Sequence, residues 1–119
     1  MKKILVLDDS VAMVRMIQSV LQKEGYRVIG ISDPSQIEQT IDSEEPSLIL
    51  LDVVMPERNG FQICRALKSS QAYQNIPIIV VSGKSTPSDR FWAEQQGASG
   101  YVAKPFAPAE LLREVRRLA

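Results

Sequence analysis

The sequence predicts one α/β domain over residues 1–119, a doubly wound five-stranded parallel sheet in the order 2-1-3-4-5 with helices on both faces. Short unbroken aliphatic runs at 4–7, 48–51 and 78–81 are typical of strands buried on both faces. Segments with helical spacing of apolar residues alternate with strand-like segments, as in a parallel sheet covered by helices. Right-handed crossovers leave few topologies, and this strand order is the simplest.

The first strand, Ile4–Leu7, is followed by a helix over Val11–Glu24. Ser10 is suited to capping the start of this helix, and Gly25 to ending it, because glycine readily adopts the left-handed conformation of a helix C-terminus. The second strand is predicted at Tyr26–Ile31.

The second helix is predicted to start at Asp33-Pro34, which pairs an N-cap with a first-turn proline, and Gln36 stands in the capping-box position. This helix runs to about Glu44, and Pro46 prevents its continuation. The third strand, Leu48–Leu51, then leads directly into Asp52 and a turn.

The third helix is capped by Asn59, and the fourth strand is Ile78–Val81. Thr86-Pro87 starts a fourth helix that ends at Gly97, and Tyr101–Ala103 is a short fifth strand. Pro108 opens the last helix. The third helix carries Phe61, Cys64 and Leu67, and the fourth carries Phe91, Ala93 and Trp92, which would serve either in helix packing or as a surface anchor. An apolar stripe on the last helix is formed by Leu111, Leu112, Val115 and Leu118.

Composition excludes several classes of protein. Fourteen Lys and Arg balance fourteen Asp and Glu, so there is no electrostatic case for nucleic-acid binding. A single cysteine, Cys64, allows no intramolecular disulfide and suits a cytoplasmic location; we expect it in the core. No apolar run approaches the ~18 residues of a membrane span. The absence of histidine excludes histidine-based metal sites, acid–base catalysis and phosphohistidine carriers.

Polar side chains gather where the predicted strands end. Asp8 and Asp9 follow the first strand, Asp52 the third, Ser82 the fourth and Lys104 the fifth. In this topology the winding reverses between the first and third strands, which opens a crevice at their carboxyl ends. The sequence therefore predicts three carboxylates, a hydroxyl and an ammonium at one edge of the sheet.

Three carboxylates in one place require a proton or a cation. The electrostatic repulsion between two carboxylates 4 Å apart costs about 4 kcal/mol in an effective dielectric of about 20. A site with only oxygen ligands selects a hard cation, and few protein ligands with open positions suit Mg²⁺. Lysine and serine are donors that a phosphoryl group needs, and an aspartate can itself be the nucleophile. These residues predict a Mg²⁺-assisted phosphoryl acceptor.

The chain resembles, over its whole length, the receiver domain of response regulators, and most closely the single-domain, CheY-like regulators of chemotaxis and twitching motility. The motifs that carry this resemblance are Asp8-Asp9, Asp52 with Met55-Pro56 and Gly60, Ser82, and Lys104-Pro105-Phe106. Each motif is weak alone, but together they occur in the right order at the right strand ends.

The resemblance implies two-component signal transduction in a flavodoxin-like fold. A partner histidine kinase would phosphorylate Asp52, and the domain would be no enzyme beyond assisting its own phosphorylation and dephosphorylation. Asp9 would bind Mg²⁺ directly and Asp8 mainly through water, with Asp52 and the Val54 carbonyl as further ligands.

The resemblance also implies a switch. Lys104 would pair with the phosphoryl oxygens, and its peptide bond to Pro105 would be cis. Ser82 would move to bind the phosphoryl group, and Tyr101 would swing inward behind it. A downstream protein would then bind the face formed by the fourth helix, fifth strand and fifth helix.

Two residues depart from the best-known chemotaxis pattern. Val54 stands two residues after Asp52, where a polar side chain is common, and Lys84 stands two residues after Ser82, where acidic or polar residues are common. Both flank the expected phosphoryl site, so we expect them to affect the lifetime of the phosphorylated state.

Two alternatives remain. The chain could be a receiver from a longer regulator with a separate output domain, although Met1 just before the first strand favours a complete protein. It could also be a degenerate, phosphorylation-independent binding module, but such domains typically lack one of the acidic residues or the lysine.

Two other protein classes are excluded by single residues. A haloacid-dehalogenase-type phosphatase would need an acid in place of Val54. An FMN carrier would not place Asp8 and Asp9 in its phosphate loop.

Overall fold

A computed structural model describes residues 2–55 and 58–119. Met1, Pro56 and Glu57 lie outside the described residues, and with them the expectations placed on Met1 and on the Pro56 turn. The elements in chain order are β1 (Lys3–Leu7), α1 (Val11–Gln22), β2 (Arg27–Ile31), the 3-10 turn η1 (Pro34–Gln36), α2 (Ile37–Glu44), β3 (Leu48–Leu51), α3 (Gly60–Lys68), β4 (Ile78–Ser82), α4 (Pro87–Gln95), β5 (Gly100–Ala103) and α5 (Pro108–Leu118).

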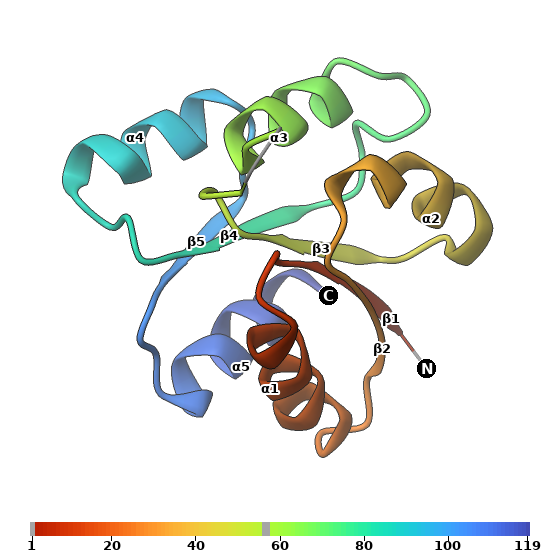
Figure 1. The fold of residues 1–119 in the computed structure, drawn as a ribbon, viewed down its shortest axis with the longest axis vertical. Coiled ribbons are helices and arrows are strands. Elements are labelled where there is room, and N and C mark those ends of the chain that lie inside the picture. Colours follow the sequence, from red (N-terminus) through yellow and green to blue (C-terminus); the bar gives the residue numbers. More distant parts are fainter. Residues whose placement is uncertain (1, 56–57) are drawn as a thin grey trace.

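The five strands form one parallel sheet in the order β2-β1-β3-β4-β5, which confirms the predicted fold. Helices α1 and α5 cover one face, and α2, α3 and α4 cover the other (Figure 1). Strand β1 lies between β2 and β3, with Leu7 paired in register with Leu51. The ends of β1 and β3 are therefore level, so the residues that follow them come out side by side.

The core has a layer on each side of the sheet. Ile4 and Val6 of β1 pack with the residues of α1 and α5, while Leu5 and Leu7 pack with those of α2 and α3. Alternate side chains of a strand point to opposite faces, so a strand covered on both faces must be apolar at every position. This explains the unbroken aliphatic runs from which the sheet was predicted.

The N-terminal caps predicted for three helices are confirmed. Ser10 accepts a hydrogen bond from the Met13 amide, and Asn59 forms a reciprocal capping box with Gln62. Thr86 does the same with Asp89. Both capping boxes satisfy amide groups that the first turn of a helix leaves without partners.

The second helical segment begins at the predicted N-cap, Asp33, with Pro34 in its first turn, but this turn is 3-10 and differs from the prediction. The Asp33 carboxylate accepts from the Ser35 amide, Pro34–Gln36 form a 3-10 turn, and α2 begins at Ile37 without a side-chain cap. Gln36 therefore makes no capping box: the tighter 3-10 turn brings Ser35, not Gln36, onto the Asp33 side chain. Helix α1 also ends at Gln22, because Glu24 and Gly25 close it with i→i−3 bonds before the positive φ of Gly25.

The helices bury slightly different residues from those expected. Ile63 of α3 is fully buried and was not predicted to be, whereas Phe61 is only half-buried. Of the three apolar residues noted in α4, only Ala93 is buried; Phe91 and Trp92 are 59% and 56% exposed, which for Trp92 agrees with the surface position that the sequence left open. No helix among the described residues is long and apolar enough to span a membrane.

The buried Cys64 gives a stability prediction at alkaline pH. Burial raises the pKa of its thiol from 9.0 to about 11, and the Sγ–H donates to the Gln96 carbonyl. Since the folded state holds this proton more tightly than the unfolded state, stability is full below pH 9 and falls as the pH rises towards 11. Relative to Cys64→Ala, we expect wild type to lose roughly 2 kcal/mol over this range in urea titrations. A constant difference between the two proteins contradicts this assignment.

Candidate functional site

The ends of β1 and β3 position two carboxylates directly. The Asp52 amide donates to the Leu7 carbonyl at 3.0 Å, and the Asp8 amide donates to the Ile31 carbonyl at 3.3 Å. These bonds extend the strand pairing by one residue and fix both aspartates at the carboxyl edge of the sheet. Gly60 packs against the same backbone, where an added Cβ would lie 2.1 Å from the Asp52 carbonyl oxygen. Glycine is thus required at the start of α3.

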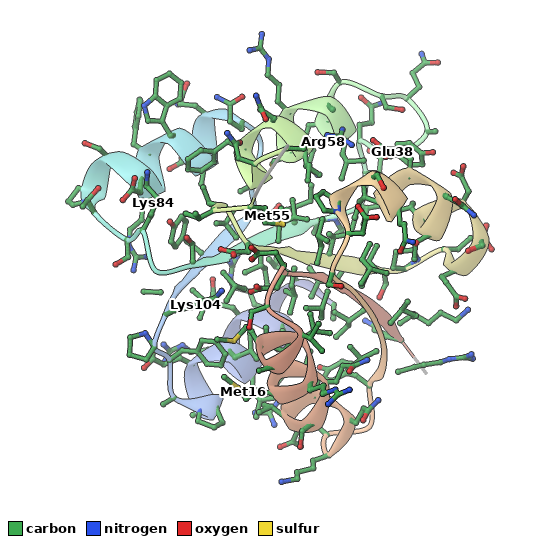
Figure 2. The ribbon with its side chains drawn as sticks, in the orientation of Figure 1. Met16, Glu38, Met55, Arg58, Lys84 and Lys104 are labelled. Carbon is green, nitrogen blue, oxygen red and sulfur yellow. The ribbon has the colours of Figure 1, made fainter. Side chains whose placement is uncertain are left out.

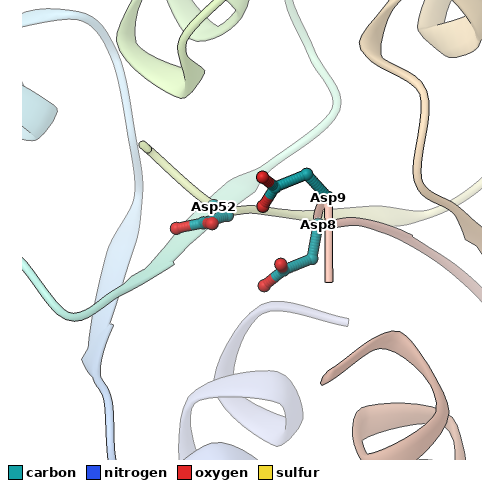
Figure 3. A group of neighbouring side chains, drawn as sticks. All are labelled: Asp8, Asp9 and Asp52. Carbon is teal, nitrogen blue, oxygen red and sulfur yellow. The ribbon is translucent and has the colours of Figure 1, made fainter. Parts of the chain in front are cut away.

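The predicted acid cluster is present. Carboxylate oxygens of Asp8, Asp9 and Asp52 lie within 4.8 Å of one another (Figure 3). Asp8 and Asp52 are only 2% and 7% exposed, whereas Asp9 is exposed. All three candidate ligands are carboxylates; those of Asp8 and Asp52 are buried, and that of Asp9 is exposed. This donor chemistry fits a hard divalent cation with open coordination positions.

Lys104 reaches into the cluster from the loop after β5. Its Nζ lies 2.6 Å from Asp8 Oδ2 and 3.6 Å from Asp52 Oδ2. The other Asp8 oxygen accepts from the Ser10 amide at 2.9 Å. The Lys104–Pro105 peptide bond is cis, as the resemblance implied. Both oxygens of Asp8 therefore already have hydrogen-bond partners.

Burial, and next the Asp8 charge, raise the pKa of Asp52 above its usual value. The Lys104 ammonium and the amides of Val54 and Val53 act in the opposite direction. This carboxylate is therefore held where its negative charge is poorly solvated, which a cation beside it would relieve.

Ser82 and Tyr101 are linked through the backbone of Lys84. The Ser82 Oγ is buried and accepts from the Lys84 amide at 3.2 Å, while the Tyr101 hydroxyl donates to the Lys84 carbonyl. The Arg90 guanidinium lies 5.0 Å from the centre of the Tyr101 ring. A movement of Ser82 would therefore disturb Lys84, the residue whose carbonyl accepts from the Tyr101 hydroxyl.

Val54 and Lys84 lie on the loops that follow β3 and β4, at the carboxyl edge of the sheet. The Val54 side chain is 58% exposed. Lys84 is exposed on the loop after β4 (Figure 2). Sequence reasoning missed one pair next to the site: the Arg58 guanidinium contacts the Glu38 carboxylate of α2 at 2.8 Å. No local pattern joins a loop residue to a helix residue this far back in the chain.

Comparisons with known proteins agree with this geometry. The family profile described as the response regulator receiver domain matches residues 4–116. The transcriptional regulatory protein GltR of Pseudomonas aeruginosa is 34% identical over 117 residues, which are 98% of this chain and 48% of GltR. The alkaline phosphatase synthesis transcriptional regulatory protein PhoP of Bacillus subtilis shows the same identity and coverage. The chain thus spans about half the length of these curated relatives.

Solved structures match the whole fold. The chemotaxis protein CheY4 of Vibrio cholerae has a TM-score of 0.93 at 29% identity, covering 100% of this chain and 99% of that chain. The BeF3-activated N-terminal receiver domain of Klebsiella pneumoniae RstA has a TM-score of 0.91 at 27% identity, covering 98% and 97%. The sequence profile, the curated relatives and the folded structures agree: this chain belongs to the response regulator receiver domain family.

Proposed function

We propose that residues 1–119 act as one phosphorylatable receiver in which Asp52 accepts a phosphoryl group from a phosphohistidine of a histidine kinase. The observation that carries this proposal is the meeting of Asp8, Asp9 and Asp52 within 4.8 Å, with the Lys104 ammonium 3.6 Å from Asp52. A degenerate binding module would have no need to maintain such costly charges in a mostly buried place.

In the proposed reaction, an Asp52 carboxylate oxygen attacks the phosphorus of the donor. A P–O bond forms, the P–N bond to the donor histidine breaks, and the leaving imidazole keeps the electron pair and takes a proton from water. The Lys104 ammonium stabilises charge on the phosphoryl oxygens. Burial and the Asp8 charge raise the pKa of Asp52, and the Lys104 ammonium acts in the opposite direction by favouring the ionised, nucleophilic carboxylate.

The residues that would hold Mg²⁺ are Asp9, Asp52 and the Val54 carbonyl, with Asp8 acting through water. The hydrogen bonds that both Asp8 oxygens already make to Lys104 and Ser10 support this indirect role for Asp8. When bound, the ion neutralises charge on the phosphoryl oxygens and on the acid cluster.

The first test of this function is Mg²⁺-dependent labelling. We expect acetyl phosphate to add one phosphoryl group to the wild-type protein in the presence of Mg²⁺, and chelation by EDTA to prevent it. Intact-mass spectrometry measures the adduct. Equal labelling with and without Mg²⁺ contradicts the proposed role of the acid cluster.

We further propose that phosphorylation changes the face formed by α4, β5 and α5, which then binds a separate protein or an attached output domain. The support is the link from Ser82 through the Lys84 backbone to Tyr101. A ligand can shift such a surface only by binding its two states unequally, and Ser82 would supply the difference by contacting the phosphoryl group. A cytoplasmic location and a role in chemotaxis or twitching motility stay predictions.

Amide hydrogen exchange tests this output face. With the phosphoryl analogue beryllofluoride and Mg²⁺, we expect changed protection in α4, β5 and the start of α5. Changes confined to α1 and α2 contradict this choice of face. The variant Tyr101→Ala tests the proposed link. It should reduce the change in amide protection of α4 while leaving the labelling of Asp52 intact.

A further inference from the structure

The Tyr101 ring contacts both the core and an exposed arginine of α4. It packs against a small cluster of buried side chains, which are Val53, Val80 and Ala93. The guanidinium of Arg90, whose side chain is exposed, lies over the ring at 5.0 Å from its centre. The ring is therefore held in its position by apolar packing and by one cation.

Open space borders this pair on the face formed by α4, β5 and α5. Two hollows of about 270 and 160 Å³ lie there, and both Arg90 and Tyr101 line each of them. Tyr101 itself is only half-buried. A half-buried ring beside open space can change rotamer with little rearrangement of the core. The position of the ring is therefore sensitive to the few contacts that it makes.

The Tyr101 hydroxyl couples the position of the ring to that of Ser82. It donates to the Lys84 carbonyl, and the Lys84 amide donates to Ser82 Oγ at 3.2 Å. In the proposed function Ser82 moves to contact the phosphoryl group, which breaks or lengthens its bond to Lys84. A contact that stabilises the observed position of the ring therefore opposes the movement of Ser82, because the two positions are linked.

We infer that Arg90 is a positioning residue for the switch: its guanidinium holds Tyr101 in the observed position and so opposes the response to phosphorylation. This inference rests on the proposed function. The direction follows from the contacts, because Arg90 lies over the ring in the same arrangement in which Ser82 bonds to Lys84. A cation over an aromatic face at an exposed site shifts such an equilibrium about two- to fivefold.

Arg113 of α5 provides a matched control. It is an exposed arginine, and it lines one of the two hollows that Arg90 and Tyr101 border. Within the described part of the chain, Arg90 is the only cation found over an aromatic ring. Arg113→Met therefore removes the same charge from the same face as Arg90→Met does, but it leaves the contact with the ring intact.

The test is the affinity for beryllofluoride at fixed Mg²⁺, measured by titration of amide chemical shifts. Arg90→Met should bind this analogue about two- to fivefold more tightly than wild type does. Arg113→Met should bind as wild type does, and Arg90→Lys, which keeps the cation but not the planar group, should lie between wild type and Arg90→Met. In a Tyr101→Ala background, Arg90→Met should change nothing, since no ring remains. A merely structural role of Arg90 would weaken binding when lost, not tighten it.

Scalar couplings of the Tyr101 side chain, measured without Mg²⁺ or beryllofluoride, report its χ1 rotamer populations. We expect one dominant rotamer in wild type and in Arg113→Met, and a mixture in Arg90→Met.

Three results would overturn the inference: unchanged or weaker binding of beryllofluoride by Arg90→Met, equal tightening in Arg113→Met, or the full effect of Arg90→Met in the Tyr101→Ala background. Absence of binding by the wild type contradicts the proposed function itself. The rotamer populations then decide on Arg90 alone, and a wild-type distribution in Arg90→Met shows that it does not position the ring.

Discussion

Asp52→Asn abolishes phosphoryl labelling by acetyl phosphate and by a phosphorylated histidine kinase; this is the largest effect that we expect. An amide oxygen is a poor nucleophile and a poor ligand for Mg²⁺, so the substitution removes both proposed roles of the side chain. Asparagine has nearly the same shape, and the backbone bond from the Asp52 amide to Leu7 does not depend on the side chain. Intact-mass spectrometry after incubation with Mg²⁺ and donor measures the result.

The variant is expected to stay folded. Burial and the Asp8 charge raise the pKa of Asp52, which means that the carboxylate is unfavourable in the metal-free fold at neutral pH. Its thermal midpoint without Mg²⁺ should therefore equal or exceed that of wild type. Asp42→Asn, an exposed site on α2 where the amide can still accept from Tyr73, is the control and should label normally. An undiminished adduct on Asp52→Asn excludes Asp52 as the acceptor.

The second large effect concerns how long the phosphoryl group persists. Hydrolysis needs a water that approaches the phosphorus in line, opposite the Asp52 oxygen. A polar side chain beside that path can orient the water, but Val54 has no donor or acceptor, and Lys84 donates without accepting. Both side chains are exposed, so they can be exchanged without disturbing the core. We expect slower self-dephosphorylation here than in receivers with polar or acidic residues at these positions.

The double variant Val54→Asn with Lys84→Glu should accelerate the loss of the phosphoryl group severalfold or more, since about 1.4 kcal/mol of barrier is a factor of ten. The measurement is decay of the phosphorylated form at fixed Mg²⁺ after the donor is removed. Arg27→Glu, an exposed charge reversal on β2, controls for net charge and should leave the rate unchanged. Decay of the double variant at the wild-type rate shows that these side chains do not control the water.

The sequence predicted the sheet and the acid cluster because both follow from short-range patterns combined with one topological rule. Aliphatic runs located the strands, and parallel pairing brought Asp8 and Asp52 to the same edge. The caps at Ser10, Asn59 and Thr86 were predictable for a similar reason, since each bond joins residues three apart.

What could not be predicted depends on packing between distant segments. The Glu38–Arg58 pair depends on the rotation of α2 and on the path of the loop after β3, neither of which the sequence pattern specifies. Exposure of Trp92 depends on which side of α4 meets the sheet, and a small residue, Ala93, takes the buried position. The 3-10 turn at 34–36 depends on Asp33 bonding to Ser35 rather than one residue further along.

The most direct measurement of the central claim is the position of the acyl phosphate. Borohydride reduces an aspartyl phosphate to homoserine, which marks the modified residue in a peptide map of the phosphorylated protein. We predict homoserine at position 52 in the wild type, formed only when Mg²⁺ was present during phosphorylation. Homoserine at position 8 or 9, or none at any position of a protein that carries the phosphoryl adduct, contradicts Asp52 as the acceptor.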